Sequence, residues 1–317
     1  MIHCVMPTTS RRRWCIERAI KCWLAQDYPI ADRRLVILDG PNTDGKSVRD
    51  LVPKHPRIFY LSLERDDPKV ATVGDKYNLG CALAATDDWI ALWADDDWHS
   101  SKRLSAVVKE MERYGSDIGG TVSMMMYRMI DGQLFLYAFP FSLEERPTDD
   151  PDRVNFAATL PYLIGGTIIF ARGRWQKIDG FKPMRSGTDS DFVNRIVVGQ
   201  ESWTTNHVKI IPERHGHVMV AEVITDLPDG TENVCKVVQI NDPRLYCAFI
   251  HGDNTGNPVK GAREGVTYEE SRTLTKVGAD ELAALRRLMG ADADAFLTNL
   301  GPEQRVLEEQ IDVADER

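Results

Sequence analysis

The sequence lacks the features that mark several large classes of protein. None of its six cysteines forms a CxxC pair or a zinc-binding spacing, so we interpret them as small buried hydrophobic residues. There is no signal peptide and no apolar run of ~18 residues, so no membrane-spanning segment is predicted. We therefore expect a cytoplasmic protein (in the host cytoplasm, if it is encoded by a phage) that would reach a lipid-linked substrate only from the membrane surface.

Excess positive charge is also missing. The net charge of −9 argues against a general nucleic-acid binder, which needs a basic face to neutralise phosphates. The best local basic patch is Arg11-Arg12-Arg13, and the alternative interpretation of these residues is the polar first turn of a helix. The 317 residues are enough to bury a large core, in one domain or slightly more.

The most informative stretch is an acidic run, Asp95-Asp96-Asp97. It follows the apolar segment from Trp89 to Trp93, which has no Gly or Pro and predicts a buried parallel strand. Ser100 is a good N-cap for a helix whose apolar positions are spaced i, i+3, i+4, i+7 from Leu104. The three carboxylates are thus expected where a buried strand ends and a helix begins, which is where ligands bind in open α/β sheets.

The chemistry of this run points to a cation. Three adjacent carboxylates repel one another, and a nearby positive charge lowers the cost of keeping them together. Mg²⁺ and Mn²⁺ take oxygen ligands and commonly bridge to phosphates. The run therefore predicts a metal–diphosphate site, and the alternative is a solvated acidic loop that caps the next helix.

Strand and helix patterns alternate with short connections over the first 115 residues. The predicted strands are 2–6, 35–38, 58–63 and 89–93, and helices are predicted to begin near Ser10, Gly74 and Ser100. This order predicts an α/β fold with a mostly parallel central sheet flanked by helices. The ends of three strands, at Thr8, Asp39 and Asp95, can then line one crevice.

The pattern changes in the second half of the chain. Residues 118–139 are rich in strand formers, with one hairpin predicted at Asp131-Gly132 and another at Asp229-Gly230. A strand over 167–171 and a short helix around Trp175 are also predicted. From about residue 267 the sequence is polar with a helical pattern, which predicts a small helical C-terminal extension over 261–317.

An ordered series of short motifs runs through the chain. In order they are Met6-Pro7-Thr8, Gln26-Asp27-Tyr28-Pro29, Val36 to Gly40, Lys76-Tyr77-Asn78-Leu79-Gly80, Ala94 to Trp98, Gly165-Gly166-Thr167, Thr188 to Phe192 and His251 to Thr255. Their order and spacing over residues 2 to 257 resemble the GT-A-fold, inverting glycosyltransferases of family 2. The resemblance implies a Rossmann-like GT-A domain over 1–260, with a nucleotide-sugar-binding half at 1–115 and an acceptor and catalytic half at 116–260.

The resemblance also implies a reaction. A sugar passes from a nucleoside-diphosphate sugar, a UDP-sugar at the level of the family, to an acceptor hydroxyl with inversion. Mn²⁺ or Mg²⁺ would stabilise the charge on the leaving diphosphate as a Lewis acid. The acceptor stays open among a glycan, a lipid-linked sugar, a protein, a small molecule and a hydroxymethylated DNA base.

The motifs assign the contacts to the nucleotide. The residues expected to bind the donor are Pro7, Thr8, Asp39, Lys76, Asn78, Asp95 and Asp96. Lys76 would touch the diphosphate at the positive end of a helix. Leu38 stands where the family has the first Asp of a pair, so Asp39 takes over the contact to the base or ribose. The alternative interpretation of Asp39 is a turn residue before Gly40.

The metal contacts are assigned in the same way. Ala94 stands where the family has the first Asp of its DxD motif. Either Asp95 and Asp97 form the motif one step later, or Asp96 keeps the metal while Asp95 reaches the ribose; Asp96 and Asp97 are the predicted metal ligands. His251 is expected to complete the site as a neutral imidazole, and His215 is the competing candidate.

The catalytic residues come from the second half. Thr188 replaces a Glu of the family pattern, which leaves Asp189 as the general base that takes the acceptor's proton. Asp191 is a second catalytic candidate, or the anchor of the helix that follows. Trp98 and Trp175 are predicted either as sugar-stacking walls or as core residues.

Two other functions stay open. A sugar nucleotidyltransferase also uses a metal–carboxylate site, but it carries a Gly-rich loop after the first strand, where this chain has Pro7 to Ser10. A catalytically inactive nucleotide- or glycan-binding protein is favoured by Leu38, Ala94 and Thr188. Retention of the acidic run together with Asp189 disfavours it.

Overall fold

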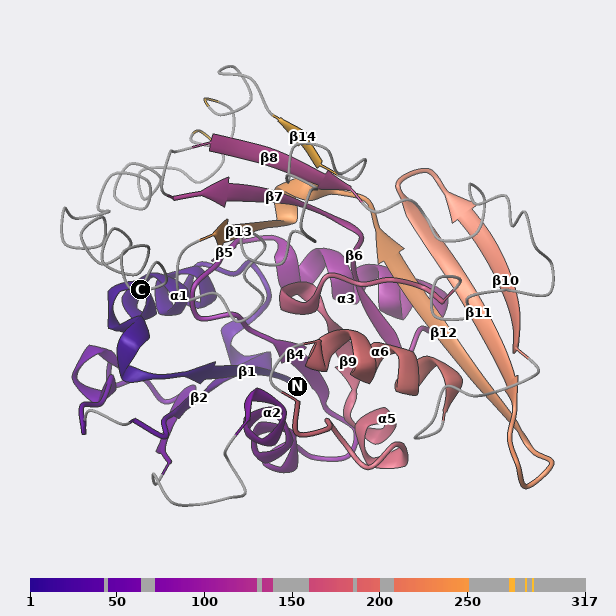
Figure 1. The fold of residues 1–317 in the computed structure, drawn as a ribbon, viewed down its shortest axis with the longest axis horizontal. Coiled ribbons are helices and arrows are strands. Elements are labelled where there is room, and N and C mark those ends of the chain that lie inside the picture. Colours follow the sequence, from indigo (N-terminus) through magenta and orange to yellow (C-terminus); the bar gives the residue numbers. More distant parts are fainter. Residues whose placement is uncertain are drawn as a thin grey trace, which may run out of the picture.

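The computed structural model describes residues 1–42, 45–63, 72–129, 133–138, 160–184, 187–199, 208–250 and 274–276, with single positions at 283 and 287. Within these ranges the strands form two sheets, one of nine strands and one of five (Figure 1). None of the helices in the described part of the chain is long and apolar enough to cross a lipid bilayer.

One side of the nine-stranded sheet is parallel. Its strands run in the order β4-β1-β2-β3, and their bounds are β1 (Ile2–Thr8), β2 (Arg33–Asp39), β3 (Ile58–Ser62) and β4 (Trp89–Leu92). Every residue of β1 is buried, because helices cover both faces of the sheet. Each strand lies within two residues of its predicted bounds, and the predicted α/β fold class is confirmed.

Beyond β4 the sheet is mixed. β9 (Ile169–Ala171) lies antiparallel between β4 and β6 (Ile118–Thr121), and β12 (Glu232–Ile240) runs parallel to β6. β11 (Val218–Asp226) and β10 (Val208–His215) extend it with antiparallel pairing. The hairpin predicted at Asp229-Gly230 joins β11 to β12 and is confirmed.

The five-stranded sheet lies above β1 and β4 in Figure 1. Its order is β14-β8-β7-β13-β5, with bounds β5 (Trp98–His99), β7 (Ser123–Arg128), β8 (Gln133–Ala138), β13 (Tyr246–Ile250) and β14 (Leu274–Lys276). β7 and β8 pair antiparallel, which confirms the first predicted hairpin, although its turn at Asp131-Gly132 lies outside the described residues. β14 is a strand within the segment predicted to be a helical extension; most of that segment lies outside the described residues.

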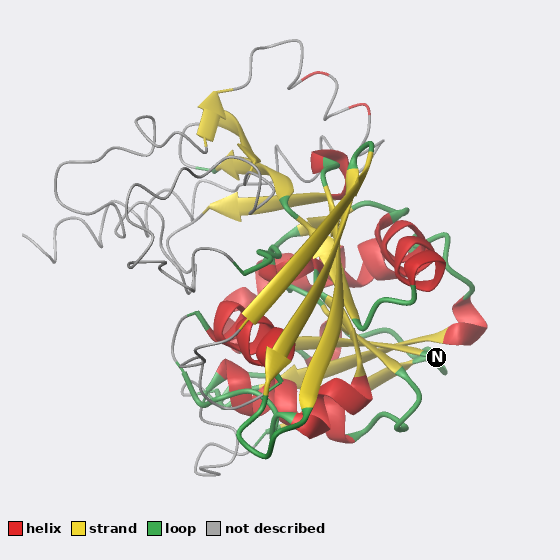
Figure 2. Cartoon of the chain, turned by 90° about the vertical axis from the view of Figure 1, so that its right-hand side faces the viewer, coloured by secondary structure: helices red, strands yellow, loops and turns green. Residues whose placement is uncertain are grey.

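Helices cover both faces of the large sheet (Figure 2). α1 (Arg13–Leu24) and α3 (Arg103–Tyr114) pack on one face, with Cys4 and Met6 of β1. α2 (Val73–Ala82), α5 (Arg172–Lys177) and α6 (Thr188–Val198) pack on the other, with Val5 of β1. Successive side chains of a strand point to opposite faces, so one apolar strand serves both cores.

Two predicted helix caps are wrong. Ser10 lies in a 3-10 turn before α1, and its backbone N–H donates to Asn42 Oδ1 at 2.7 Å. Lys102, not Ser100, is the N-cap of α3, and it makes no side-chain cap. β5 lies between the acidic run and α3, so the three carboxylates do not precede the helix directly.

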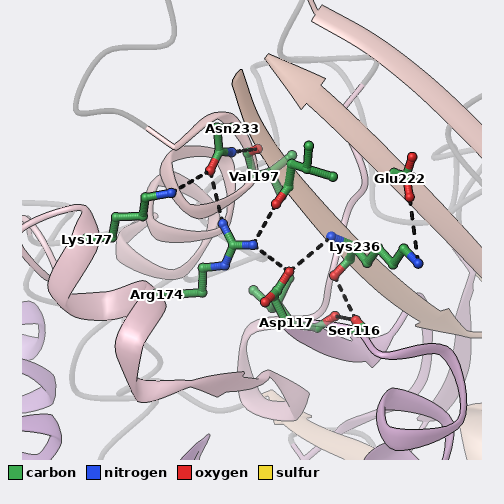
Figure 3. Close-up of polar contacts among 10 residues, drawn as sticks. Ser116, Asp117, Arg174, Lys177, Val197, Glu222, Asn233 and Lys236 are labelled. Carbon is green, nitrogen blue, oxygen red and sulfur yellow. Dashed lines mark hydrogen bonds and ion pairs between the residues drawn. The ribbon is translucent and has the colours of Figure 1, made fainter. Parts of the chain in front are cut away.

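A polar cluster holds β12 against the helices (Figure 3). Arg174 of α5 pairs with Asp117 at 2.6 Å and donates to Asn233 Oδ1 at 3.0 Å. Asn233, buried in β12, donates in turn to the carbonyl of Val197 in α6 at 3.1 Å. These bonds fix the position of α6, the helix that carries Asp189, relative to the sheet.

Candidate functional site

A cavity of about 320 Å³ lies at the carboxyl edge of the parallel strands. It is bounded by the turn after β1, the segment after β2, the start of α2 and the acidic run. Its walls are Pro7, Thr8, Thr9, Ser10, Arg11, Arg12, Pro41, Asn42, Val73, Lys76 and Asp95. Of the three strand ends predicted to share a crevice, Thr8 and Asp95 line this cavity and Asp39 does not.

Lys76 is a buried cation in the cavity wall. It lies in the first turns of α2, and its Nζ donates to the carbonyl of Thr8 at 3.0 Å. Burial lowers the pKa of Lys76 to about 8, while the carboxylates of Asp95 and Asp39 act in the opposite direction. An anion bound in the cavity would stabilise the protonated form, which suits the predicted contact with a diphosphate.

Asp95 and Asp96 share one cation. Arg12 Nη1 lies 2.5 Å from Asp95 Oδ1 and 2.8 Å from Asp96 Oδ2. The other carboxylate oxygen of Asp95, Oδ2, is buried and has no hydrogen-bond partner among the described residues. Burial raises the pKa of Asp95, and the Arg12 guanidinium counteracts this rise.

Asp97 is held by the protein itself. The Tyr246 hydroxyl donates to Asp97 Oδ2, and the Phe249 N–H donates to Oδ1 at 2.8 Å. Both donors belong to β13, so this carboxylate joins the acidic run to the five-stranded sheet. Each carboxylate oxygen of Asp97 thus already accepts one hydrogen bond, and its predicted metal contact stays a prediction. Its neighbour Trp98 packs in an apolar cluster with Phe249, which favours the core interpretation of that tryptophan.

A divalent ion suits Asp95 and Asp96 better. Mg²⁺ is commonly held by one or two carboxylates, with phosphate oxygens and water completing its shell. The unpartnered, buried Asp95 Oδ2 beside the cavity is an oxygen that a cation would satisfy. Within the described ranges no group of three or more His, Cys, Asp or Glu side chains could hold a metal. An ion at Asp95 and Asp96 would therefore need further ligands from water, from a bound molecule or from residues outside these ranges, such as the predicted His251.

Two histidines, His251 and His215, are the predicted candidates for the metal site. His251 lies outside the described residues, so its predicted metal contact stays a prediction. His215 pairs with Glu213 at 3.1 Å and stacks on Tyr114, the last residue of α3. That end of α3 is about 16 Å along the helix from Arg103, which lies near the acidic run. This position disfavours His215 as a metal ligand.

Asp39 organises the segment that follows β2. It is fully buried and accepts hydrogen bonds from the side chains of Asn42, Ser47 and Tyr60 and from the backbone N–H of Val48. These are the partners of a turn residue. They favour the turn interpretation of Asp39 over the predicted contact with a nucleobase, and they leave Asn42 as the side chain of this segment in the cavity wall.

The Lys76–Gly80 motif is partly structural. Asn78 donates to the carbonyl of Phe181 and accepts from the Phe181 N–H and from Trp175 Nε1, at 2.7–2.9 Å. Gly80 packs so closely on β1 that a Cβ would lie 2.3 Å from Val5 Cγ1. Because the amide of Asn78 ties α2 to the second half of the chain, we do not retain its predicted nucleotide contact.

Asp189 lies at the start of α6, close to the acidic run. A Cβ on Gly165 would lie 1.9 Å from Asp189 Oδ2, so the carboxylate rests against that glycine. A Cβ on the next residue, Gly166, would lie 2.0 Å from the hydroxyl of Tyr246, the donor to Asp97. Two adjacent glycines therefore contact Asp189 on one side and the Tyr246–Asp97 pair on the other.

The charges of both groups of carboxylates act on Tyr77. Burial raises the pKa of its phenol, and the charges of Asp189, Asp95 and Asp96 raise it further. Burial also raises the pKa of Asp189. A raised pKa is what a carboxylate needs in order to accept a proton near neutral pH.

Asp191 has a different environment from Asp189. It forms a buried ion pair with Arg195, with Oδ2 lying 2.8 Å from Nε. Arg195 also donates to the carbonyls of Ile178 and Gly180, at 3.0 Å and 2.8 Å. Of the two predicted roles of Asp191, these contacts favour the anchor, through an ion pair and not through a helix cap.

Two residues of this site had no role assigned from the sequence. Arg12 was considered only within the basic triplet, although its position four residues after the end of β1 was a usable signal. Tyr246 had no such signal, because it lies 149 residues from Asp97 in the chain.

A family model matches the first part of the chain. Residues 4–134 match the model of glycosyl transferase family 2. This segment contains β1 to β4, α2 and the acidic run. The predicted resemblance is therefore confirmed: the chain has the GT-A fold and carries the family 2 segment.

Solved structures agree on the fold. S. aureus TarS 1-349, in complex with UDP-GlcNAc, matches with a TM-score of 0.53 and 15% identity over 94% of this chain and 70% of that one. The mannosyltransferase PcManGT from Pyrobaculum calidifontis, in complex with GDP-Man and Mn²⁺, matches with a TM-score of 0.45 and 19% identity over 62% and 52% of the two chains. At 15% identity, the likeness to TarS shows the fold alone. A comparison with curated protein sequences finds no match.

Proposed function

We propose that the protein transfers a sugar from a nucleoside-diphosphate sugar to an acceptor hydroxyl, with inversion at the anomeric carbon. The observation that carries this proposal is the cavity at the carboxyl edge of the family 2 segment, where cations and a carboxylate face each other and Asp189 lies nearby. A UDP-sugar is our first choice of donor, since the TarS structure that shares this fold holds UDP-GlcNAc.

Different cavity residues bind the nucleoside and the diphosphate of the donor. The turn at Pro7 and Thr8 receives the nucleoside, with Asn42 on the opposite wall. Lys76 and Arg12 face the diphosphate and offset the negative charge that develops as it leaves. Mn²⁺ or Mg²⁺, held by Asp95 and Asp96, would supply Lewis acidity to the same oxygens.

Asp189 takes the proton of the acceptor hydroxyl. The raised pKa of its carboxylate favours this transfer, and Gly165 lets the carboxylate lie close against the backbone. Attack from the side of Asp189, opposite the diphosphate, gives inversion. The acceptor class stays open among glycan, lipid-linked, protein and modified-base hydroxyls, and the cytoplasmic location and the division at residue 260 stay predictions.

The test is release of nucleoside diphosphate from a panel of UDP- and GDP-sugars, with Mn²⁺, with Mg²⁺ and with EDTA. We expect turnover that EDTA reduces and that Asp95→Asn and Asp189→Asn abolish, whereas Asp87→Asn, at an exposed site, behaves as the wild type. The anomeric configuration of the product, read by NMR, tests inversion. Turnover at the wild-type rate in Asp189→Asn would refute the assignment of the base.

An inactive binding protein is the second candidate. The observation that favours it is Arg12, which already pairs with both carboxylates of the metal site. Binding of UDP without turnover, for every donor and acceptor tried, would support it. Pyrophosphate-dependent exchange of the nucleotide would instead identify a nucleotidyltransferase.

A further inference from the structure

The guanidinium of Arg12 lies where a metal ion would be expected. Its Nη1 bridges one oxygen of Asp95 and one of Asp96, at 2.5 Å and 2.8 Å. The Asp95 and Asp96 side chains are only 2% and 7% exposed, so the bridge lies at the buried edge of the cavity. Two neighbouring buried carboxylates require a nearby positive charge, and Arg12 supplies it.

Arg12 differs from its two arginine neighbours. Arg13 turns away and pairs with Asp50 on the surface, and Arg11 is exposed. Arg12 ends the 3-10 turn that precedes α1, and this turn forms part of the cavity wall. The same guanidinium can therefore reach the carboxylates on one side and an anion in the cavity on the other.

Lys76 shows that a cation in this cavity need not cover the carboxylates. Its ammonium donates to the carbonyl of Thr8 and makes no ion pair with Asp95 or Asp96 within 4 Å in the described residues. Lys76 and Arg12 thus differ in role: Lys76 adds positive charge to the cavity, whereas Arg12 occupies oxygens of the predicted metal ligands.

We propose that Arg12 is a resident cation that competes with the divalent ion for Asp95 and Asp96, and that it transfers to the diphosphate when the donor binds. This inference rests on the proposed function. A guanidinium matches the geometry of phosphate as well as that of carboxylate. Its transfer makes the binding of metal and of nucleotide interdependent, and such coupling is reciprocal.

The test is a thermodynamic cycle on the whole protein. Mn²⁺ binding is measured by calorimetry or by EPR, alone and with saturating UDP or GDP, and nucleotide binding is measured with and without Mn²⁺. In the wild type we expect Mn²⁺ alone to bind weakly and the nucleotide to raise its affinity by about tenfold or more, within the usual range of coupling. Equal Mn²⁺ affinity with and without nucleotide would overturn the proposal, whatever the variants do.

Two variants of equal charge separate competition from simple electrostatics. Arg12→Gln uncovers the carboxylates, so Mn²⁺ alone should bind about tenfold tighter than to the wild type. Saturating nucleotide should then raise the Mn²⁺ affinity by a smaller factor than it does in the wild type. Lys76→Gln removes one positive charge from the same cavity but leaves Arg12 on the carboxylates, so the Mn²⁺ affinity should change much less. Equal effects of the two variants would overturn the proposal. If Arg12→Gln does not fold, Arg12→Lys is the substitute variant. It keeps the positive charge but loses the guanidinium, and we expect an Mn²⁺ affinity above that of the wild type.

The outcomes also distinguish this inference from the proposed function. A wild-type protein that binds neither nucleotide nor Mn²⁺ would refute both. A protein that binds both ligands independently, and transfers sugar, would refute only the role of Arg12.

Discussion

Asp189 and Asp191 lie two residues apart on α6, and their substitution should have opposite consequences. Asp189 has a raised pKa because it is buried, and the structure gives it no basic side chain as an ion-pair partner among the described residues. Asp191 is buried with Arg195 at 2.8 Å. We expect Asp189→Asn to abolish transfer and keep stability, and Asp191→Ala to lose stability first.

The magnitudes follow from these environments. Removing one partner of a buried ion pair typically costs about 3–5 kcal/mol, because the other charge stays buried. Arg195 keeps two carbonyl partners, Ile178 and Gly180, so Asp191→Ala should fall near the lower limit, at about 3 kcal/mol. Loss of the general base in Asp189→Asn should lower kcat by about 10²–10⁴-fold.

The stability of Asp189→Asn has a predicted pH dependence. The pKa of Asp189 is higher in the folded than in the unfolded protein, so its ionisation costs stability as pH rises from the ordinary value of 3.8 through the folded pKa. Asparagine removes this cost, so the variant should be as stable as the wild type or more stable at neutral pH. The advantage should disappear below pH 3.8, where the carboxyl is protonated in both states.

Chemical denaturation measures the unfolding free energy and diphosphate release measures the transfer activity, both on the same preparations. Asp87→Asn, at an exposed site, serves as the control. The reasoning would be refuted if Asp189→Asn lost about 3 kcal/mol of unfolding free energy, as expected only for Asp191→Ala. It would also be refuted if Asp191→Ala kept full stability and lost transfer.

Three further predictions concern the cavity and its supports. The donor KM should rise above about pH 8, because Lys76 loses its proton there and with it the attraction for the diphosphate; Lys76→Arg should move this limb to higher pH in a pH–rate profile. Asn78→Ala should lower the unfolding free energy by about 1–3 kcal/mol, since three partly buried hydrogen bonds lose their partner, and leave the donor KM nearly unchanged. Gly165→Ala should lower kcat more than it changes the donor KM, because the new methyl group would displace the Asp189 carboxylate; an unchanged kcat would contradict the placement of that carboxylate.

The sequence alone determined the parallel half of the sheet and the location of the site along the chain. Apolar runs of four to six residues with no breaker predicted β1 to β4 because the period and composition of a buried strand are local properties. The rule that ligands bind at the carboxyl edge then predicted a crevice at Thr8, Asp39 and Asp95, of which Thr8 and Asp95 line the cavity. The family motifs also predicted Asp189 as a catalytic residue. That prediction rests on the order of the motifs in the sequence and not on the helices that lie between the acidic run and Asp189.

Only the tertiary structure decided what each polar side chain does within these motifs. Asp97 and Asn78 stand in motifs that predicted ligand contacts, yet their partners are Tyr246 and Phe181, more than a hundred residues away in the chain. Arg12 looked like one charge of a surface triplet and instead bridges two buried carboxylates. The physical reason is that a carboxylate or an amide takes whichever donors the fold brings within about 3 Å, and burial makes an unpaired polar atom costly enough to fix that choice.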